Sequence, residues 1–155
     1  MTTPTPSPNG KTAARRARDR EFLDTYTQAL QLALAQHVPN AQQLAVLWTI
    51  HNSRPRYHVS FERAYKVVSL LLRGKRPALR ESLQLAMWRE LAQRVRMLTA
   101  GHTMSVASAL EFVLEHGHAS RFFVSERYAR ETLVPRARRE RMQDLRQRHH
   151  SVLPS

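Results

Sequence analysis

The sequence predicts a mostly α protein: a compact multi-helix domain with an internal pseudo-repeat. Apolar residues recur at spacings of three and four over most of the chain, as they do in amphipathic helices. Prolines and glycines separate these stretches into helix-sized pieces. The segment RYHVSFERA, which begins at Arg56, returns as RFFVSERYA from Arg121. Each half of the chain therefore reads as an apolar helix, a short extended segment and another helix.

Length and composition divide the 155-residue chain into one domain and two tails. Residues 1–12 are rich in Pro, Thr, Ser and Asn, so we expect a disordered N-terminal tail. Residues 13–134 carry nearly all of the apolar periodicity, and we expect them to form a single helical domain. Residues 135–155 are rich in arginine and predict a basic C-terminal tail, either helical or disordered.

The N-terminal part of the domain predicts two helices. The first runs from Ala13 to about Gln36, and Pro39 stops it. Asn40 followed by Gln43 is a capping-box pattern, which predicts the start of the second helix. The residues expected to face inward from this second helix are Leu44, Leu47 and Trp48.

The middle of the chain predicts three more helices. Ser60 is placed to cap the first of them, which ends at Gly74. The longest helix is expected from about Ala78 to Thr99, with Gly101 as a candidate C-cap. A shorter amphipathic helix follows and ends at Gly117. Aromatic residues expected to pack in the core from helix faces are Trp48, Trp88 and Phe112.

The second copy of the repeat predicts the end of the domain. Ser125 is expected to cap a helix that reaches Val134, where Pro135 either kinks it or opens a new helix. The extended segments of the two copies are each too short to be stable alone. If they form strands, we expect a minimal two-stranded pairing between them, and this expectation fails if the two segments lie far apart.

The longer sequence around the repeat resembles a known group of proteins. The stretches RYHVSFERAYKVVSLLLRGKR, AMWRELAQRVRML and RFFVSERYARETL carry the likeness. They are similar to an uncharacterised family of small basic bacterial proteins, found in gut bacteria and their phages or mobile elements, with a duplicated Arg-aromatic-x-Val-Ser segment before a helix. The resemblance covers Ser53–Leu133, and it implies the internal repeat and a phage or mobile-element origin.

The charge balance points to a polyanionic partner. The chain has 25 Lys+Arg against 12 Asp+Glu, a formal net charge of +13, and only three of the basic residues are lysines. Such a surface attracts polyanions, of which nucleic acid is the commonest, and guanidinium groups suit phosphate and guanine contacts as well as protein ion pairs. No stretch is long and apolar enough for a signal peptide or a membrane span, so we expect a cytoplasmic protein without membrane contact.

The arginines of the repeat and of the C-terminal part are the candidate binding residues. Ser60 and Ser125 would leave first-turn amides free at helix N-termini, and nearby arginines would surround an anion there. The positions predicted to contact nucleic acid are Arg54, Arg56, Ser60, Arg63, Arg121, Ser125, Arg127, Arg130, Arg136, Arg138, Arg139 and Arg141. The alternative is structural: the serines only cap helices, and the arginines pair with Glu62, Glu126 or neighbouring carbonyls.

Two DNA-binding patterns fit the sequence poorly. ALEFVLEHG and SERYARETL resemble the two helices of a helix-turn-helix, but the link between them is longer than the usual three- or four-residue turn. RGKRP, from Arg73, resembles a minor-groove hook, although Gly74 also reads as the end of a helix.

Enzyme chemistry finds little support. The chain has no cysteine and only four glycines, which removes thiolate chemistry and leaves no phosphate-cradling loop. His116 and His118 lack a further ligand at useful spacing, so we expect no metal site, no cofactor and no catalytic residue.

The sequence therefore predicts a non-enzymatic nucleic-acid-binding protein, with DNA favoured and RNA left open. This interpretation requires that the surplus arginines lie together on an exposed side. An alternative is a protein–protein interaction or structural/assembly component that uses residues 22–53 to form a homo-oligomer or to dock on an acidic partner. Between Phe22 and Ser53 the only Asp, Glu, Lys or Arg is Asp24, which is typical of deeply packed helices or of a partner interface.

Overall fold

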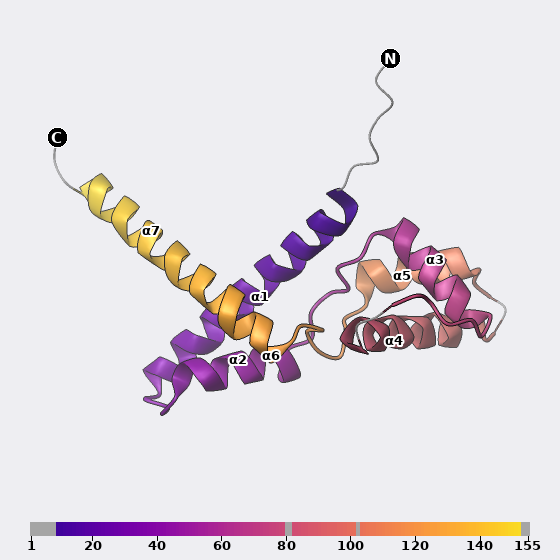
Figure 1. The fold of residues 1–155 in the computed structure, drawn as a ribbon, viewed down its shortest axis with the longest axis horizontal. Helices are drawn as coiled ribbons and strands as arrows, with labels where there is room; N and C mark the ends of the chain where they lie inside the picture. The colour runs from indigo at the N-terminus through magenta and orange to yellow at the C-terminus, as the bar shows by residue number, and fades with distance from the viewer. Residues whose placement is uncertain (1–8, 80–81, 102, 153–155) are drawn as a thin grey trace, which may run out of the picture.

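The computed structural model describes residues 9–79, 82–101 and 103–152, and confirms a mostly α, multi-helix domain (Figure 1). The helices in chain order are α1 (Asn9–Ala35), α2 (Ala41–Asn52), α3 (Phe61–Leu72), α4 (Ser82–Thr99), α5 (Val106–His116), α6 (Glu126–Tyr128), the π-helical segment η1 (Ala129–Leu133) and α7 (Val134–Val152). α6, η1 and α7 follow one another without a break. No strand occurs among the described residues.

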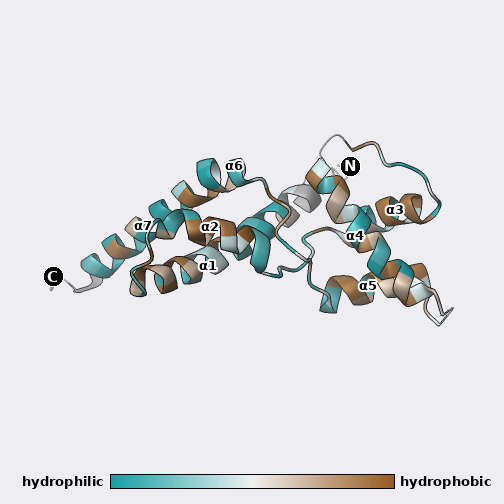
Figure 2. Ribbon diagram, turned by 90° about the horizontal axis from the view of Figure 1, so that it is seen from below, coloured by the Kyte–Doolittle hydropathy of each residue, from teal (hydrophilic) through white to brown (hydrophobic). Residues whose placement is uncertain are grey.

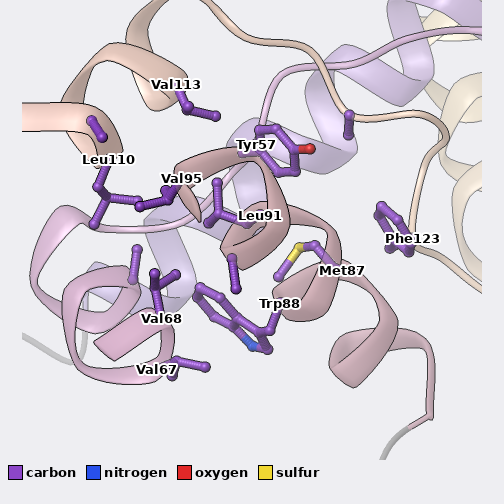
Figure 3. Close-up of a cluster of buried hydrophobic side chains, with 14 residues drawn as sticks. Tyr57, Val67, Val68, Met87, Trp88, Leu91, Val95, Leu110, Val113 and Phe123 are labelled. Atoms are coloured by element: carbon purple, nitrogen blue, oxygen red, sulfur yellow. The ribbon is translucent and has the colours of Figure 1, made fainter. Parts of the chain in front are cut away.

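The buried side chains form two clusters. The terminal cluster joins α1 and α2 to η1 and the first turn of α7, with Phe22, Ile50 and Leu133 among its members. The central cluster joins α3, α4 and α5 around Trp88 and Leu91 (Figure 3). The first and last parts of the chain therefore fold together, while the middle folds against itself.

Two extended segments, residues 53–60 and 117–125, connect the clusters and lie side by side. The amide of Ala119 donates to the carbonyl of Pro55 at 2.6 Å, and the amide of Phe122 donates to the carbonyl of Ile50 at 3.0 Å. The expected contact between the segments is thus present, but they form no pair of strands in the described chain. Their side chains are divided between the clusters.

Alternation along the second segment is what joins the two clusters. Ala119 and Phe123 belong to the central cluster, whereas Phe122 and Val124 belong to the terminal cluster. In an extended chain successive side chains point to opposite sides. The same few residues therefore complete both clusters, and neither cluster is closed without them.

Two glutamates hold these segments from opposite sides. Glu90 of α4 accepts hydrogen bonds from the Tyr57 hydroxyl at 2.6 Å and from the Ser120 amide at 2.9 Å. Glu21 of α1 accepts the Arg56 amide at 2.9 Å and lies 3.2 Å from Nε2 of His58. Glu90 thus anchors both extended segments to α4, and Glu21 anchors the first of them to α1.

The helix ends follow the sequence closely at three positions. Ser60 and Ser125 each accept a first-turn amide, from Arg63 at 3.3 Å and from Tyr128 at 3.0 Å respectively, as predicted for N-caps. Gly74 has a positive φ of 74° after α3. Its amide and that of Lys75 return to carbonyls of the last turn of α3, which is the Schellman arrangement that favours glycine.

Other boundaries differ from the prediction. Residues 9–12, expected in a disordered tail, belong to α1, and residues 1–8 lie outside the described chain. Asn40 precedes α2 in a left-handed conformation with no side-chain hydrogen bond, so the predicted capping box is absent. Pro135 lies in the first turn of α7, which is one of the two predicted alternatives, although α7 continues from η1 without a break. The amide of Val134 bonds to the carbonyl of Ala129, five residues back, and this π-helical turn accommodates the missing proline N–H.

The predicted inner face of α2 points outward. Leu44 and Trp48, expected in the core, are 46% and 48% exposed. The buried face of α2 instead consists of Ala41, Ala45, Val46, Thr49 and Ile50. Phe112 of α5 was also expected in the core, but it is 48% exposed. Trp88, by contrast, is buried as predicted, with 1% of its surface exposed.

Within the described residues, no helix has both the length and the apolar character that crossing a bilayer requires.

The anchoring role of Glu90 predicts a specific pH dependence. Burial by itself would raise the pKa of Glu90, but the hydrogen bonds from Ser120 and Tyr57 outweigh it and lower the pKa below the ordinary 4.5. Its contribution to stability is therefore present above pH 4.5 and is lost as the pH falls through the lower folded-state pKa. Glu90→Gln should lower the free energy of unfolding by about 1–3 kcal/mol at neutral pH.

Urea unfolding of the wild type and of Glu90→Gln, at neutral and at strongly acidic pH, measures the difference in the free energy of unfolding. The difference between the two proteins should shrink in acid. Glu111→Gln, on the exposed face of α5, is the matched control. A Glu90→Gln protein no less stable than this control would contradict the anchoring role.

Candidate nucleic-acid interface

Two of the predicted arginines bind backbone carbonyls of the protein itself. The Arg56 guanidinium donates to the carbonyls of Leu114 and Glu115 at the C-terminal end of α5. The Arg121 guanidinium donates to the carbonyls of Phe122 and Val124 at 3.0 and 3.4 Å. These two side chains stabilise a helix end and an extended segment, which matches the structural alternative considered for the repeat.

Three other predicted arginines form ion pairs. Arg127 lies 3.2 Å from Glu131, and Arg130 pairs with Glu126, in both cases one helical turn apart. Arg136 of α7 lies 3.5 Å from Asp19 of α1. Asp19 is only 3% exposed, so the Arg136 pair links α7 to the terminal cluster, while the two surface pairs are expected to add little stability.

The remaining C-terminal arginines are exposed. Arg138, Arg139 and Arg141 form no ion pair within the described chain, and Arg146 shares this property. At 3.6 residues per turn, these four positions occupy an arc of about 160° on α7. Glu140 and Asp144 fall on the opposite side, and Glu140 pairs with Arg20 of α1 at 2.9 Å. We call Arg138, Arg139, Arg141 and Arg146 the basic face of α7.

α7 carries this face away from the rest of the molecule. Among the residues of α7 up to 150, Ala137 is the last that is buried, and every residue from 141 to 150 is exposed. Figure 1 shows the free end of α7 diverging from α1 and pointing away from α3, α4 and α5. Figure 2 shows hydrophilic residues along much of its length. The basic face is therefore accessible to a large partner.

A cleft of about 880 Å³ between the two clusters brings together other predicted residues. Ser60, Arg63 and Ser125 line it. Two arginines of α1, Arg15 and Arg18, line it as well. None of the described residues in its lining is acidic. We call this the basic cleft.

The structure separates the two helices that were compared with a helix-turn-helix, in agreement with the poor fit of that pattern to the sequence. α5 packs in the central cluster, whereas α6 and η1 contribute to the terminal cluster, and the extended segment 117–125 runs between them. Arg54, at the start of the neighbouring segment, is exposed, and its carbonyl accepts from Nδ1 of His118 at 3.1 Å. RGKRP directly follows the last residue of α3, and Gly74 ends this helix, as the alternative to a minor-groove hook predicted.

No group of three or more His, Asp or Glu side chains within the described residues is arranged to hold a metal ion. The chain matches no family model, and neither a curated protein nor a solved structure matches it.

Sequence reasoning missed Arg15 and Arg18 as members of a site with Arg63. Both lie in the run RRARDR, which predicts phosphate contacts without sequence readout, or a solubilising basic segment, but no particular site. The signal that could have found them is their spacing of three, because it places both on one side of α1. Nothing local shows that α3 approaches that side, since this depends on how the two clusters pack.

The carbonyl contacts predict that Arg56 and Arg121 act mainly on stability. Arg56→Ala and Arg121→Ala should each lower the free energy of unfolding by about 1–2 kcal/mol, because each removes charge-assisted hydrogen bonds to carbonyls. Arg138→Ala should change it by less than about 0.5 kcal/mol. Thermal unfolding of the three variants measures the difference. Equal stability in all three would show that the carbonyl contacts are not formed.

Proposed function

We propose that the protein binds nucleic acid, with DNA as the favoured partner, through phosphate contacts made by the basic face of α7. The observation that carries the proposal is this exposed row of arginines on a helix that leaves the body of the protein. A net charge of +13 supplies long-range attraction, and the guanidinium groups provide the short-range contacts. No catalytic step is part of the proposal.

The shape of α7 favours duplex DNA over duplex RNA. An α-helix with its side chains is about 10–12 Å across, and the major groove of B-DNA is about 12 Å wide. The major groove of A-form RNA is too narrow to admit one. Arginines spread over an arc of about 160° would reach phosphates on both sides of a groove that holds the helix. A phage or mobile-element origin stays a prediction from the sequence resemblance.

The proposal predicts strong salt dependence with little sequence preference. Replacing Arg138, Arg139 and Arg141 by alanine should weaken binding to every duplex alike by roughly tenfold, and lower the slope of log affinity against log salt by about 2–3. Fluorescence anisotropy with labelled duplexes of different sequence, titrated at several salt concentrations, measures both quantities. Duplex RNA of equal length should bind more weakly.

A charge-matched control tests the location of the site. Arg76, Arg89 and Arg96 are exposed on the central-cluster side of the protein. Their triple alanine variant loses the same charge and should bind nearly as well as wild type. Equal loss in both triple variants would assign the attraction to net charge alone, and salt-independent binding would overturn the proposal.

A second candidate function is self-assembly through α2. Leu44 and Trp48 project outward on the same side of α2, with half-buried Leu47 beside them. This surface lies in the stretch from Phe22 to Ser53, where Asp24 is the only Asp, Glu, Lys or Arg. Copies of a strongly basic chain repel each other least at such an uncharged surface.

Self-assembly predicts that Leu44→Glu with Trp48→Glu turns an oligomer into a monomer. Both side chains are half exposed, so the double variant should keep its fold. Sedimentation velocity over a range of protein concentrations measures the oligomeric state of each protein. Met97→Glu, at a position 69% exposed on α4, is the control and should leave the oligomer intact. A wild-type protein that stays monomeric at all concentrations would rule this candidate out.

A further inference from the structure

The basic cleft has the size and position of a ligand site. Its volume of about 880 Å³ falls within the range of small-molecule sites, about 300–1,000 Å³. Its walls come from α1, from residues 58–60 and the first turn of α3, from Leu79 and the N-terminal half of α4, and from residues 123–125 and Tyr128. It lies at the junction of the two clusters, whereas the basic face of α7 lies on a helix that points away from them.

Positive charge gathers in the cleft. Arg15, Arg18 and Arg63 line it, and none of its described lining residues is acidic. Arg18 is partly neutralised by Asp19 at 3.0 Å, but Arg15 and Arg63 form no ion pair among the described residues. Like charges held on facing walls repel each other, so an anion between them would be stabilised.

The positive end of α3 adds to this field. Ser60 and Arg63, the N-cap and the third residue of the helix, both line the cleft. α3 has 12 residues, and the first-turn amides that Ser60 does not take have no acceptor inside the helix. The N-terminus of a helix of this length favours a negative charge.

A buried donor without an acceptor forms part of the same wall. Trp88 lines the cleft and is 1% exposed, and its indole Nε1 finds no hydrogen-bond partner within the described structure. Figure 3 shows this nitrogen on the edge of the ring that faces away from Leu91 and Val95. The Arg63 guanidinium lies 6.0 Å from the centre of the Trp88 ring. An oxygen of a bound anion at this wall would give the indole N–H the acceptor that it lacks.

We propose that the basic cleft binds a phosphate monoester whose organic part has an apolar ring face, such as the base of a nucleotide. Arg15 and Arg63 would hold the phosphate, with the α3 N-terminus beside it. Leu79, Leu83 and Phe123 supply apolar lining for the attached group. The phosphate can belong to a free nucleotide or to the 5′ end of a nucleic-acid strand, and the experiment separates these sources. The proposal does not depend on binding by α7.

Tryptophan fluorescence provides a direct readout. The chain has two tryptophans, and Trp48→Phe leaves Trp88, in the wall of the cleft, as the sole reporter. In this background a deoxynucleoside 5′-monophosphate should give a saturable change in emission. Inorganic phosphate should bind more weakly, and the nucleoside without phosphate should bind weakest. A monophosphate that gives no saturable change at millimolar concentration would overturn the proposal.

Ser60→Asp separates anion binding from folding. Aspartate caps a helix as well as serine does, so α3 is preserved, while a negative charge enters the cleft. This variant, and the double variant Arg15→Ala with Arg63→Ala, should each weaken monophosphate binding by about tenfold or more. The double variant Arg138→Ala with Arg141→Ala removes as much charge as Arg15→Ala with Arg63→Ala, but outside the cleft. It should leave monophosphate binding unchanged. Unaltered binding by Ser60→Asp, with α3 intact by circular dichroism, would overturn the proposal.

Oligonucleotides with and without a 5′ phosphate identify the source of the phosphate. If a strand end is the ligand, the phosphorylated oligonucleotide should bind more tightly than the unphosphorylated one to the Arg138→Ala, Arg141→Ala protein, and Ser60→Asp should remove the difference. Equal binding of the two oligonucleotides, together with saturable monophosphate binding, would assign the cleft to free nucleotides. Loss of duplex binding in the α7 variants with intact monophosphate binding would show that the two sites are separate.

Discussion

The structure depends on the extended segment from Ala119 to Val124, because it completes two hydrophobic clusters at once. Phe122 and Val124 close the terminal cluster, and Ala119 and Phe123 close the central one. Backbone hydrogen bonds to Ile50 and Pro55 hold this segment against the chain that leaves α2. The basic cleft exists because the clusters meet there without merging. A change in the segment would therefore alter both clusters and the cleft between them.

The scarcity of carboxylates explains much of the charge distribution. The chain has 12 acids, and Asp19, Glu21 and Glu90 are used as internal anchors at or near the junction. Asp19 accepts the Tyr128 hydroxyl at 2.7 Å, which joins α1 to α6. Acids that hold the fold together cannot neutralise distant arginines. The surplus arginines therefore do not lie together on one exposed side, as the sequence interpretation required. They lie on the basic face of α7, in the cleft, and at Arg76, Arg89 and Arg96 on the central-cluster side, and the two proposed sites use the first two of these regions.

Helix caps could be predicted from the sequence, whereas the buried faces of helices and the contacts between distant residues could not. Ser60, Ser125 and Gly74 act within one helical turn, so the residue type at each position was enough to predict its role. The predicted inner face of α2 was wrong because apolar residues occupy both sides of this helix. The buried side includes small residues such as Ala45, which allow α1 to pack closely. The contacts of Arg56 and Arg136 join residues far apart in the chain. The chain-wide pseudo-repeat stays a prediction: its two serines cap alike, but Arg56 and Arg121 bind different carbonyls.

Cooperativity of unfolding tests the central claim about the junction most directly. In the Trp48→Phe protein, Trp88 emission reports the central cluster alone, while far-ultraviolet circular dichroism reports the helices of both clusters. If the extended segments bind the clusters into one unit, the two signals should follow a single transition with the same midpoint in urea. A circular dichroism curve with two phases, only one of which coincides with Trp88 emission, would show that the clusters unfold independently and would contradict the claim.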